Sequence, residues 1–499
     1  MAQQSFLLKN GTVLIHNANN NVVPTRTDVL IDNGKIIRLA ESIEASDNVE
    51  VIDCTDKIIS PGFIDTHHHG WQTQLKGRHA NQLFFEYMVT GGYQSVNYTA
   101  TDGFWGQLAG MLEALAAGTT TIVDHAHITM SPEHARFGIA ATASSGVRAV
   151  YCYNPMVRPK SLTPLHMHEN PLEDWVMQTF STLVDQAPFG NGRVTMGFAY
   201  DMWFLPKEMT QAVFDQVKEK DIRTVTCHAN PWMSVIQLLR EFSLLDERFL
   251  ISHGGLFSRE DAEYVKKMGA HVSSTPSTEL QMALGGRPIC FDASFSEGER
   301  RHGIQENASF GVDCHSNQSG SIISEARIGL QDARMHFNEG YESQGKAARK
   351  LPDSLSVEAA FNLATIKGAE AVRMDKEIGR IAEGYKADLV VFNSLSPAMI
   401  CAAQHDPVAA ILLHSSPADI DLVMVDGIVR KKDGTLLPIS VDVMANEAVP
   451  AALLAWKDIA RETLKSRARI QEQARKVDVA ESMTILKNMW HIDDSSFAD

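Results

Sequence analysis

Short apolar runs recur through the middle of the chain, separated by polar or amphipathic stretches. Eight of them are rich in β-branched residues and bounded by turn residues, as buried strands are. They read GFIDTHHH, TTTIVDHAH, VRAVYCYN, VTMGFAYD, IRTVTCHAN, FLISHGG, AHVSSTP and ASFGVDCHS. Stretches between them, such as SREDAEYVKKMG with Ser258 as a candidate N-cap and Gly269 as a stop, have a helical pattern. Eight strands alternating with helices predict an α/β fold, a (β/α)₈ TIM barrel over residues 60–370. A doubly wound sheet is the alternative, but it has no reason to stop at eight strands.

Both ends of the chain are also rich in short strands. Residues 1–59 and 371–440 each contain too few strands to bury a core alone, so we expect them to form one small composite β-sandwich. Residues 441–499 are charged and are predicted to form a helical extension that packs on the barrel or on a partner subunit. The hairpin signals are the pairs Asn10-Gly11, Asn33-Gly34, Asp426-Gly427 and Asp433-Gly434.

Composition narrows the class of protein. The net charge of −16 argues against a nucleic-acid or anionic-membrane partner and leaves a small-molecule substrate as the expected partner. The first twenty residues lack the pattern of a signal peptide, and no apolar run is long enough to cross a bilayer. The six cysteines are scattered without a CxxC pair, which favours reduced thiols in a cytoplasmic protein.

Titratable side chains follow several of the predicted strands. His67 and His69 end the first strand, His228 the fifth, His253 the sixth and Asp313 the eighth. Side chains alternate along a strand, so His67 and His69 share one face while the intervening histidine points away. One histidine at a strand end is usually an ordinary polar residue. Because all strand ends of a barrel meet on one face, five such residues together predict a metal site.

These motifs resemble the metal-dependent amidohydrolase superfamily, in its cytosine deaminase and chlorohydrolase-like branch. PGFIDTHHH, EALAAGTTTIVD, CHAN, SHGG, GVDCHS and the tail GRIAEGYKADLVVF carry the resemblance over nearly the whole chain. It implies that His67, His69, His228 and Asp313 bind one divalent ion, and that His253 orients the bound water. Dinuclear members carry a bridging lysine near the fourth strand, and VTMGFAYD has none at its end. We therefore expect one ion, zinc first, with Fe²⁺ or Mn²⁺ as alternatives, and a homo-oligomer, either dimer or tetramer.

The resemblance also implies a reaction. The ion would lower the pKa of its bound water, Asp313 would accept the proton, and His253 would stabilise the developing charge. The predicted function is metal-dependent hydrolysis of a non-peptide C–N bond in a small substrate, with cyclic and aromatic compounds as candidates. The alternatives are a heterocycle deaminase or dechlorinating hydrolase of the same branch, a non-catalytic scaffold with the same fold, and a decarboxylase or lyase on the same barrel.

One departure from the branch affects this prediction. Its deaminases carry a Glu three residues after the fifth-strand His, where this chain has Pro231. Proline cannot transfer a proton, which weakens the nucleobase deaminase assignment. Glu279, after the seventh strand, is a candidate replacement acid, with a surface carboxylate as the alternative. The predicted substrate contacts are Trp71, Gln72, His125, His127, Tyr200, Asp201 and Trp203. For the two histidines of that set, hydrogen bonding behind the ligands is the alternative.

Overall fold

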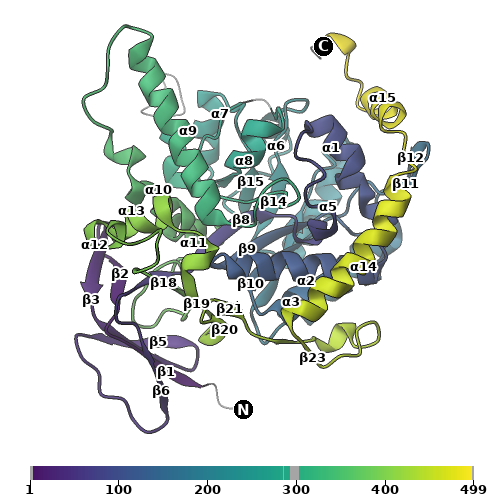
Figure 1. Cartoon of the computed structure of the whole chain (residues 1–499). Helices are drawn as coiled ribbons and strands as arrows, with labels where there is room; N and C mark the ends of the chain where they lie inside the picture. Colours follow the sequence, from purple (N-terminus) through teal and green to yellow (C-terminus); the bar gives the residue numbers. More distant parts are fainter. Residues whose placement is uncertain (1–3, 285, 293–302, 497–499) are drawn as a thin grey trace.

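A closed barrel of eight parallel strands forms the centre of the computed structural model, which describes residues 4–284, 286–292 and 303–496 (Figure 1). The strands are neighbours in chain order: β8 (Phe63–His68), β9 (Thr119–Ala126), β10 (Arg148–Tyr153), β13 (Val194–Ala199), β14 (Val225–His228), β15 (Phe249–Ser252), β16 (His271–Ser274) and β17 (Ala308–Phe310). A parallel bridge between His68 and Asp313 joins the end of the β17 segment to β8. The predicted (β/α)₈ barrel is confirmed, since all eight apolar runs form its strands.

Helices surround the barrel. They are α2 (Ala100–Ala116), α3 (Pro132–Ser145), α4 (Asp174–Gln186), α5 (Lys207–Glu219), α6 (Val235–Glu241), α7 (Arg259–Lys267), α8 (Pro276–Gln281), α9 (Ile322–Glu342), α10 (Val357–Ala364) and α11 (Ile366–Ala371). Nearly every residue of α2 is buried. A Cβ at Gly106 would lie 2.2 Å from the carbonyl oxygen of Trp71, so glycine in this helix permits close approach of the segment after β8.

Strands from both ends of the chain form a separate β unit at the lower left of Figure 1. One sheet contains β1 (Ser5–Lys9), β4 (Asp28–Asp32), β5 (Lys35–Ala40) and β6 (Val49–Asp53). The other contains β2 (Thr12–His16), β3 (Val22–Arg26), β7 (Lys57–Pro61), β18 (Leu389–Asn393), β19 (Ile420–Val425), β20 (Ile428–Lys432) and β21 (Thr435–Leu436). Because β7 pairs with β18, the N- and C-terminal segments share one sheet, as expected for the composite unit.

The hairpin signals gave one wrong prediction. Antiparallel pairing confirms the turns at Asn33-Gly34, Asp426-Gly427 and Asp433-Gly434. At Asn10-Gly11, however, β1 and β2 enter different sheets. A type I′ hairpin needs positive φ at both central residues. Asn10 has φ 65°, but Gly11 does not adopt a positive φ, so the chain crosses between the sheets instead of reversing.

Two long insertions between elements of the barrel meet at one side of it. Between β8 and α2 the chain forms η1 (Gly70–Leu75), α1 (Phe84–Thr90) and η2 (Gly92–Asn97), and after β10 it forms the hairpin β11 (Pro159–Leu162) and β12 (Leu165–Met167). The C-terminal helices α14 (Trp456–Ala474) and α15 (Val479–Met489), yellow in Figure 1, run along α2 to α1. Among the described residues, no helix is long and apolar enough to span a bilayer.

Candidate metal centre

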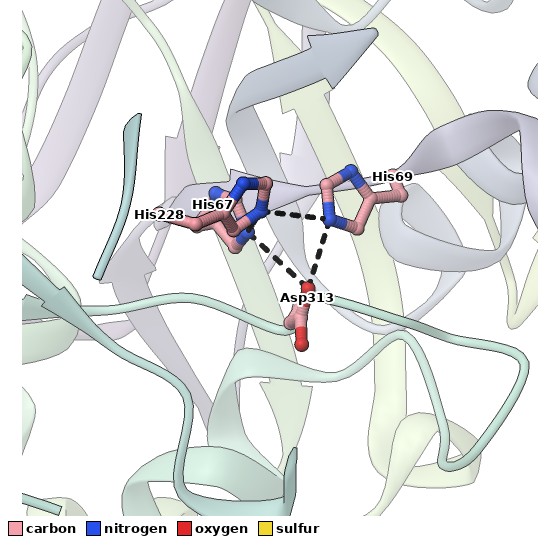
Figure 2. Close-up of side chains that lie close together, drawn as sticks. All are labelled: His67, His69, His228 and Asp313. Carbon is pink, nitrogen blue, oxygen red and sulfur yellow. Dashed lines mark hydrogen bonds and ion pairs between the residues drawn. The ribbon is translucent and has the colours of Figure 1, made fainter. Parts of the chain in front are cut away.

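The four predicted ligands converge on one point (Figure 2). The Nε2 atom of His228 lies 3.1 Å from Nε2 of His67 and 3.3 Å from Nε2 of His69. Oδ1 of Asp313 lies 3.2 Å from the first of these imidazoles and 3.0 Å from the second. Ligands held at zinc bond lengths in a tetrahedron are about 3.3 Å apart. The four atoms are therefore spaced as ligands of one small ion.

Hydrogen bonds on the far side of each ring fix which nitrogen faces the centre. Nδ1 of His69 donates to the carbonyl oxygen of His125 at 2.8 Å, and Nδ1 of His228 donates to Asp201 Oδ2 at 3.0 Å. Nδ1 of His67 lies 2.6 Å from Ser252 Oγ. In a neutral imidazole whose Nδ1 carries the proton, Nε2 presents a lone pair. Lone pairs this close to one another and to a carboxylate repel unless a cation lies between them, so the donor set fits a divalent ion.

The protonation states of His67 and Asp313 also suit ligation. Burial lowers the pKa of His67 well below its ordinary value and keeps the ring neutral. Burial would raise the pKa of Asp313, but its interactions with the surrounding imidazoles of His67, His69 and His253 outweigh burial and hold that pKa well below the usual range. Asp313 is therefore an anion in the neutral range. It also has a φ of 63°, and His253 one of 69°, a left-handed conformation that is uncommon for residues other than glycine, although Asp and His adopt it more readily than most.

Asp201 lies behind the ligand shell. Its Oδ1 accepts from the backbone N–H of His228 at 2.8 Å, and its Oδ2 contacts Nδ1 of that ring at 3.0 Å and Nε2 of His125 at 2.9 Å. Burial lowers the pKa of His125 to about 3. The structure thus places Asp201 where it orients His228. The sequence-based prediction of a substrate contact for these residues remains untested.

His68 takes no part in the ligand cluster, as strand alternation predicts. Its Nδ1 lies 2.6 Å from Asp65 Oδ2, and its Nε2 lies 2.9 Å from Nδ1 of His315. His315 in turn contacts Thr73 Oγ1 at 2.9 Å. This buried chain ties the end of β8 to the segment after β17 and to η1, so it supports the ligand strands from behind.

His253 and Glu279 form a second supporting pair. Nδ1 of His253 lies 2.9 Å from Thr275 Oγ1 and 3.7 Å from Oε1 of Glu279. The Glu279 carboxylate accepts from Ser274 Oγ at 2.7 Å and from the backbone N–H of Thr275 at 3.0 Å. Its side chain is almost fully buried. The structure therefore places Glu279 behind His253, and its burial shows that the surface-carboxylate alternative is wrong. The predicted role as replacement acid stays a prediction.

The remaining predicted substrate contacts fall into two groups. His127 lies beside the cluster, since its ring is 3.8 Å from that of His69. Gln72 is further away: its Nε2 donates to Tyr87 Oη at 2.7 Å, and Cys314 separates Tyr87 from Asp313. Trp71, Tyr200 and Trp203 are buried in the core. Trp71 packs edge-on against Tyr98, and the rings of Tyr200 and Trp203 pack against Phe214 of α5. Trp71 Nε1 also donates to Nδ1 of His127 at 3.1 Å, so this indole reaches a ring that lies against His69. The predicted substrate contacts of Trp71, Tyr200 and Trp203 stay predictions.

Sequence reasoning missed several residues around the ligands. Tyr87 and Cys314 lie beside Asp313, with the Cys314 Sγ atom 3.0 Å from Tyr87 Oη and 3.5 Å from Asp313 Oδ1. Ser252 and Asn154 contact the rings of His67 and His125. Cys314 directly follows the predicted ligand Asp313, and Ser252 directly precedes His253. Their positions in the sequence could therefore have indicated that both lie near the site. Tyr87 lies in an insertion whose position the sequence pattern does not specify.

Comparison with known proteins gives one family and one fold. The Amidohydrolase family model matches residues 58–429. The 5-methylthioadenosine/S-adenosylhomocysteine deaminase of Pyrococcus horikoshii is 24% identical over 443 residues, covering 87% of this chain and 96% of the relative. The 5′-deoxyadenosine deaminase of Methanocaldococcus jannaschii is 25% identical over 441 residues, covering 85% and 95%.

Two solved structures share the fold. A zinc-bound adenosine deaminase from Xanthomonas campestris superposes with a TM-score of 0.73 at 17% identity, covering 94% of this chain and 98% of the other. An atrazine chlorohydrolase from Arthrobacter aurescens, complexed with zinc, superposes with a TM-score of 0.71 at 19% identity, covering 93% and 100%. At these identities the likeness concerns the fold alone.

Proposed function

The chain belongs to the amidohydrolase family, and from this premise we propose that it removes an amino group from a small nitrogen heterocycle, with a purine nucleoside as the first class to test. The family makes it a metal-dependent hydrolase of C–N bonds other than peptide bonds. The observation that carries the proposal is the set of three inward-facing Nε2 atoms and one carboxylate oxygen at 3.0 to 3.3 Å. The similarity to adenosine-type deaminases over more than four fifths of the chain supports the substrate class.

We propose one zinc ion per chain, held by His67, His69, His228 and Asp313. A second group of possible ligands, His125, Asp201 and His228, shares a ring with the first. Nδ1 of that shared ring carries the proton donated to Asp201, so binding two ions would require a fully deprotonated imidazole. This argues for one ion. The zinc-bound neighbours support the choice of metal, and subunit number and cytoplasmic location stay predictions.

A bound divalent ion would supply a water molecule acidified towards neutrality and a Lewis acid for the attacked carbon. Asp313 is anionic and at the centre, so it is placed to take the proton of the attacking water and return it to the leaving amine. The contacts of His253 Nδ1 with Thr275 and Glu279 leave Nε2 as the nitrogen that stabilises negative charge on the substrate. Asp201 holds the ring of His228 in its ligating orientation.

Hydrolysis of a cyclic amide is the second candidate, and Pro231 is the observation that favours it. Deamination of an aromatic ring needs a proton at a ring nitrogen, which a carboxylic acid at this position supplies in deaminases of the branch. Opening a lactam needs only attack on the carbonyl and protonation of the departing nitrogen. Asp313 alone suffices for that transfer.

Product analysis separates the two candidates. The zinc-loaded protein is incubated with adenosine, 5′-deoxyadenosine and 5′-methylthioadenosine, and separately with a set of five- and six-membered lactams. Deamination releases ammonia and changes the purine absorbance, whereas ring opening releases no ammonia. Asp313→Asn serves as the inactive control. Turnover of lactams without any ammonia from the nucleosides would overturn the first proposal in favour of the second.

A further inference from the structure

The C-terminal helices pack on the insertion that follows the first two ligands. Ser466 Oγ of α14 donates to Asp102 Oδ1 at 2.6 Å and accepts from Gln74 Nε2 at 2.9 Å. Gln471 Oε1 accepts from Arg78 at 2.6 Å. Ile470 is buried in the same cluster as Trp71. Helix α14 therefore fixes η1, which begins immediately after His69.

Helix α15 continues this contact onto α1. Leu486 is fully buried in the cluster that contains Phe85 and Val89. Trp490, just after α15, has its ring 5.6 Å from that of Phe85 and 6.1 Å from that of Trp232. Trp232 also stacks on Phe84 of α1 at 5.3 Å. Because Trp232 follows the ligand His228 by four residues, this aromatic cluster joins α15, α1 and the loop after β14.

Helix α1 carries Tyr87, whose side chain lies one residue away from Asp313. Its hydroxyl accepts from Gln72 Nε2 at 2.7 Å and lies 3.0 Å from Cys314 Sγ. The same thiol is 3.5 Å from Asp313 Oδ1. A single sulfur atom thus separates the phenol from the carboxylate oxygen that faces the ligand imidazoles. The packing of α1 decides where the phenol lies.

We propose that α15 is a positioning element for the metal centre: Trp490 and Leu486 hold α1 against the barrel, and α1 in turn holds the Tyr87 hydroxyl between Gln72 and Cys314, beside Asp313. The phenol then limits how Cys314 and Asp313 can shift at the edge of the centre. Trp490 acts through Tyr87, so it is a positioning residue without contact to the reacting atoms. The inference does not depend on which heterocycle is the substrate.

Three variants test this coupling: Trp490→Ala, Tyr87→Phe and the double variant. Trp490 is only half-buried and lies beyond the last turn of α15, so its loss leaves the barrel core intact. Trp456→Ala is the matched control, since Trp456 is 44% exposed on the first turn of α14. Hydrogen–deuterium exchange of residues 84–97, zinc per chain, and kcat and KM are measured on each protein.

We expect Trp490→Ala to speed exchange in residues 84–97 by about tenfold or more, with zinc content unchanged. Both single variants should lower kcat by about tenfold or more, because small displacements of positioned groups are costly. The double variant should lose no more than the worse single variant, since both act on one group. The proposal would be overturned if the losses in kcat of the two single variants multiplied in the double variant. It would also be overturned if Trp490→Ala left the hydrogen–deuterium exchange of residues 84–97 unchanged.

A failure of the proposed function can be told apart from a failure of the positioning role. If the wild type hydrolyses none of the compounds tested above, the proposed function is wrong. The positioning role is then tested by hydrogen–deuterium exchange together with the visible spectrum of the Co²⁺-substituted proteins. Matching shifts of that spectrum in Trp490→Ala and Tyr87→Phe, absent from Trp456→Ala, support the positioning role. A spectrum that changes in Tyr87→Phe alone contradicts it.

Discussion

Single side chains decide whether the centre binds an ion. His67, His69 and His228 present Nε2 inward because Nδ1 of each ring has a partner behind it, and Asp313 supplies the negative charge. Among the described residues, no neighbouring side chain is oriented so that it could take the place of one of these four. Removing one imidazole from such a set leaves an incomplete shell.

His67→Ala should therefore reduce bound zinc from about one ion per chain to near zero and abolish hydrolysis. Metal content is measured by elemental analysis after dialysis against a weak chelator. His166→Ala is the control, since His166 is an exposed histidine on the hairpin of β11 and β12. Equal zinc content in the two variants would mean that the ion binds elsewhere.

Glu325 provides a pH test at one buried residue. Burial raises its pKa to about 8, although the side chain accepts hydrogen bonds from the backbone and hydroxyl of Ser277. Between about pH 4.3, the ordinary value for Glu, and pH 8 the folded state binds a proton that the unfolded state does not. The free energy of unfolding therefore falls as pH rises through this window.

Glu325→Gln removes this titration. Relative to the wild type, the variant should gain on the order of 1 kcal/mol or more in free energy of unfolding between pH 5.5 and pH 8. Urea unfolding at both pH values measures the difference. Glu342→Gln, at an exposed position of the same helix, should show no such trend. A parallel pH dependence in the wild type and Glu325→Gln would show that Glu325 does not titrate in this window.

At the scale of elements, capping and turn residues predicted a helix end or a turn correctly where the backbone adopts the conformation that the residue favours. Ser258 and Gly269 were predicted to bound a helix. In the structure α7 begins after Ser258, whose Oγ accepts from the N–H of Asp261 at 3.1 Å, and Gly269 has a φ of 71°. The hairpin predicted at Asn10-Gly11 is wrong, because the two flanking strands pair in different sheets. The local sequence of a turn does not determine the sheet in which each flanking strand pairs.

Ser258→Ala should cost about 1 kcal/mol of unfolding free energy, because the first turn of α7 loses its side-chain cap. Chemical denaturation measures the loss. Ser46→Ala is the comparison, since that serine is exposed in a turn. A cost no greater than that of the control would show that the cap adds nothing to stability.

At the scale of the molecule, a buried ion pair connects the barrel to the β unit. Nε of Arg148, at the start of β10, donates to Asp388 Oδ2 at 2.8 Å, and one Nη atom donates to Oδ1 at 3.0 Å. Asp426, in the turn after β19, lies 3.3 Å from the same guanidinium. The two parts of the chain are therefore joined by charges that cannot be separated without leaving one uncompensated.

Arg148→Leu should lower the free energy of unfolding by about 3–5 kcal/mol, because Asp388 is left buried without its partner. Urea unfolding followed by fluorescence and by circular dichroism gives both the loss and the cooperativity. Arg223→Leu, at an exposed arginine before β14, should change stability little. Comparable stability in the two variants would contradict a structural role for the buried pair.

The sequence by itself determined the eight strands and the clustering of His67, His69, His228 and Asp313 at their ends, because strand periodicity and barrel topology bring distant strand ends to one face. The resemblance of its motifs gave the family. It also indicated that the intervening histidine, His68, faces away from the cluster. The tertiary structure decided what surrounds that cluster. Glu279 lies behind His253, Trp71 lies in the core, and α15 reaches α1 and Tyr87. The contacts of Trp71 with α14 and of α15 with α1 join segments separated by hundreds of residues, and all three contacts lie outside the barrel strands, where no strand periodicity fixes the direction of a side chain.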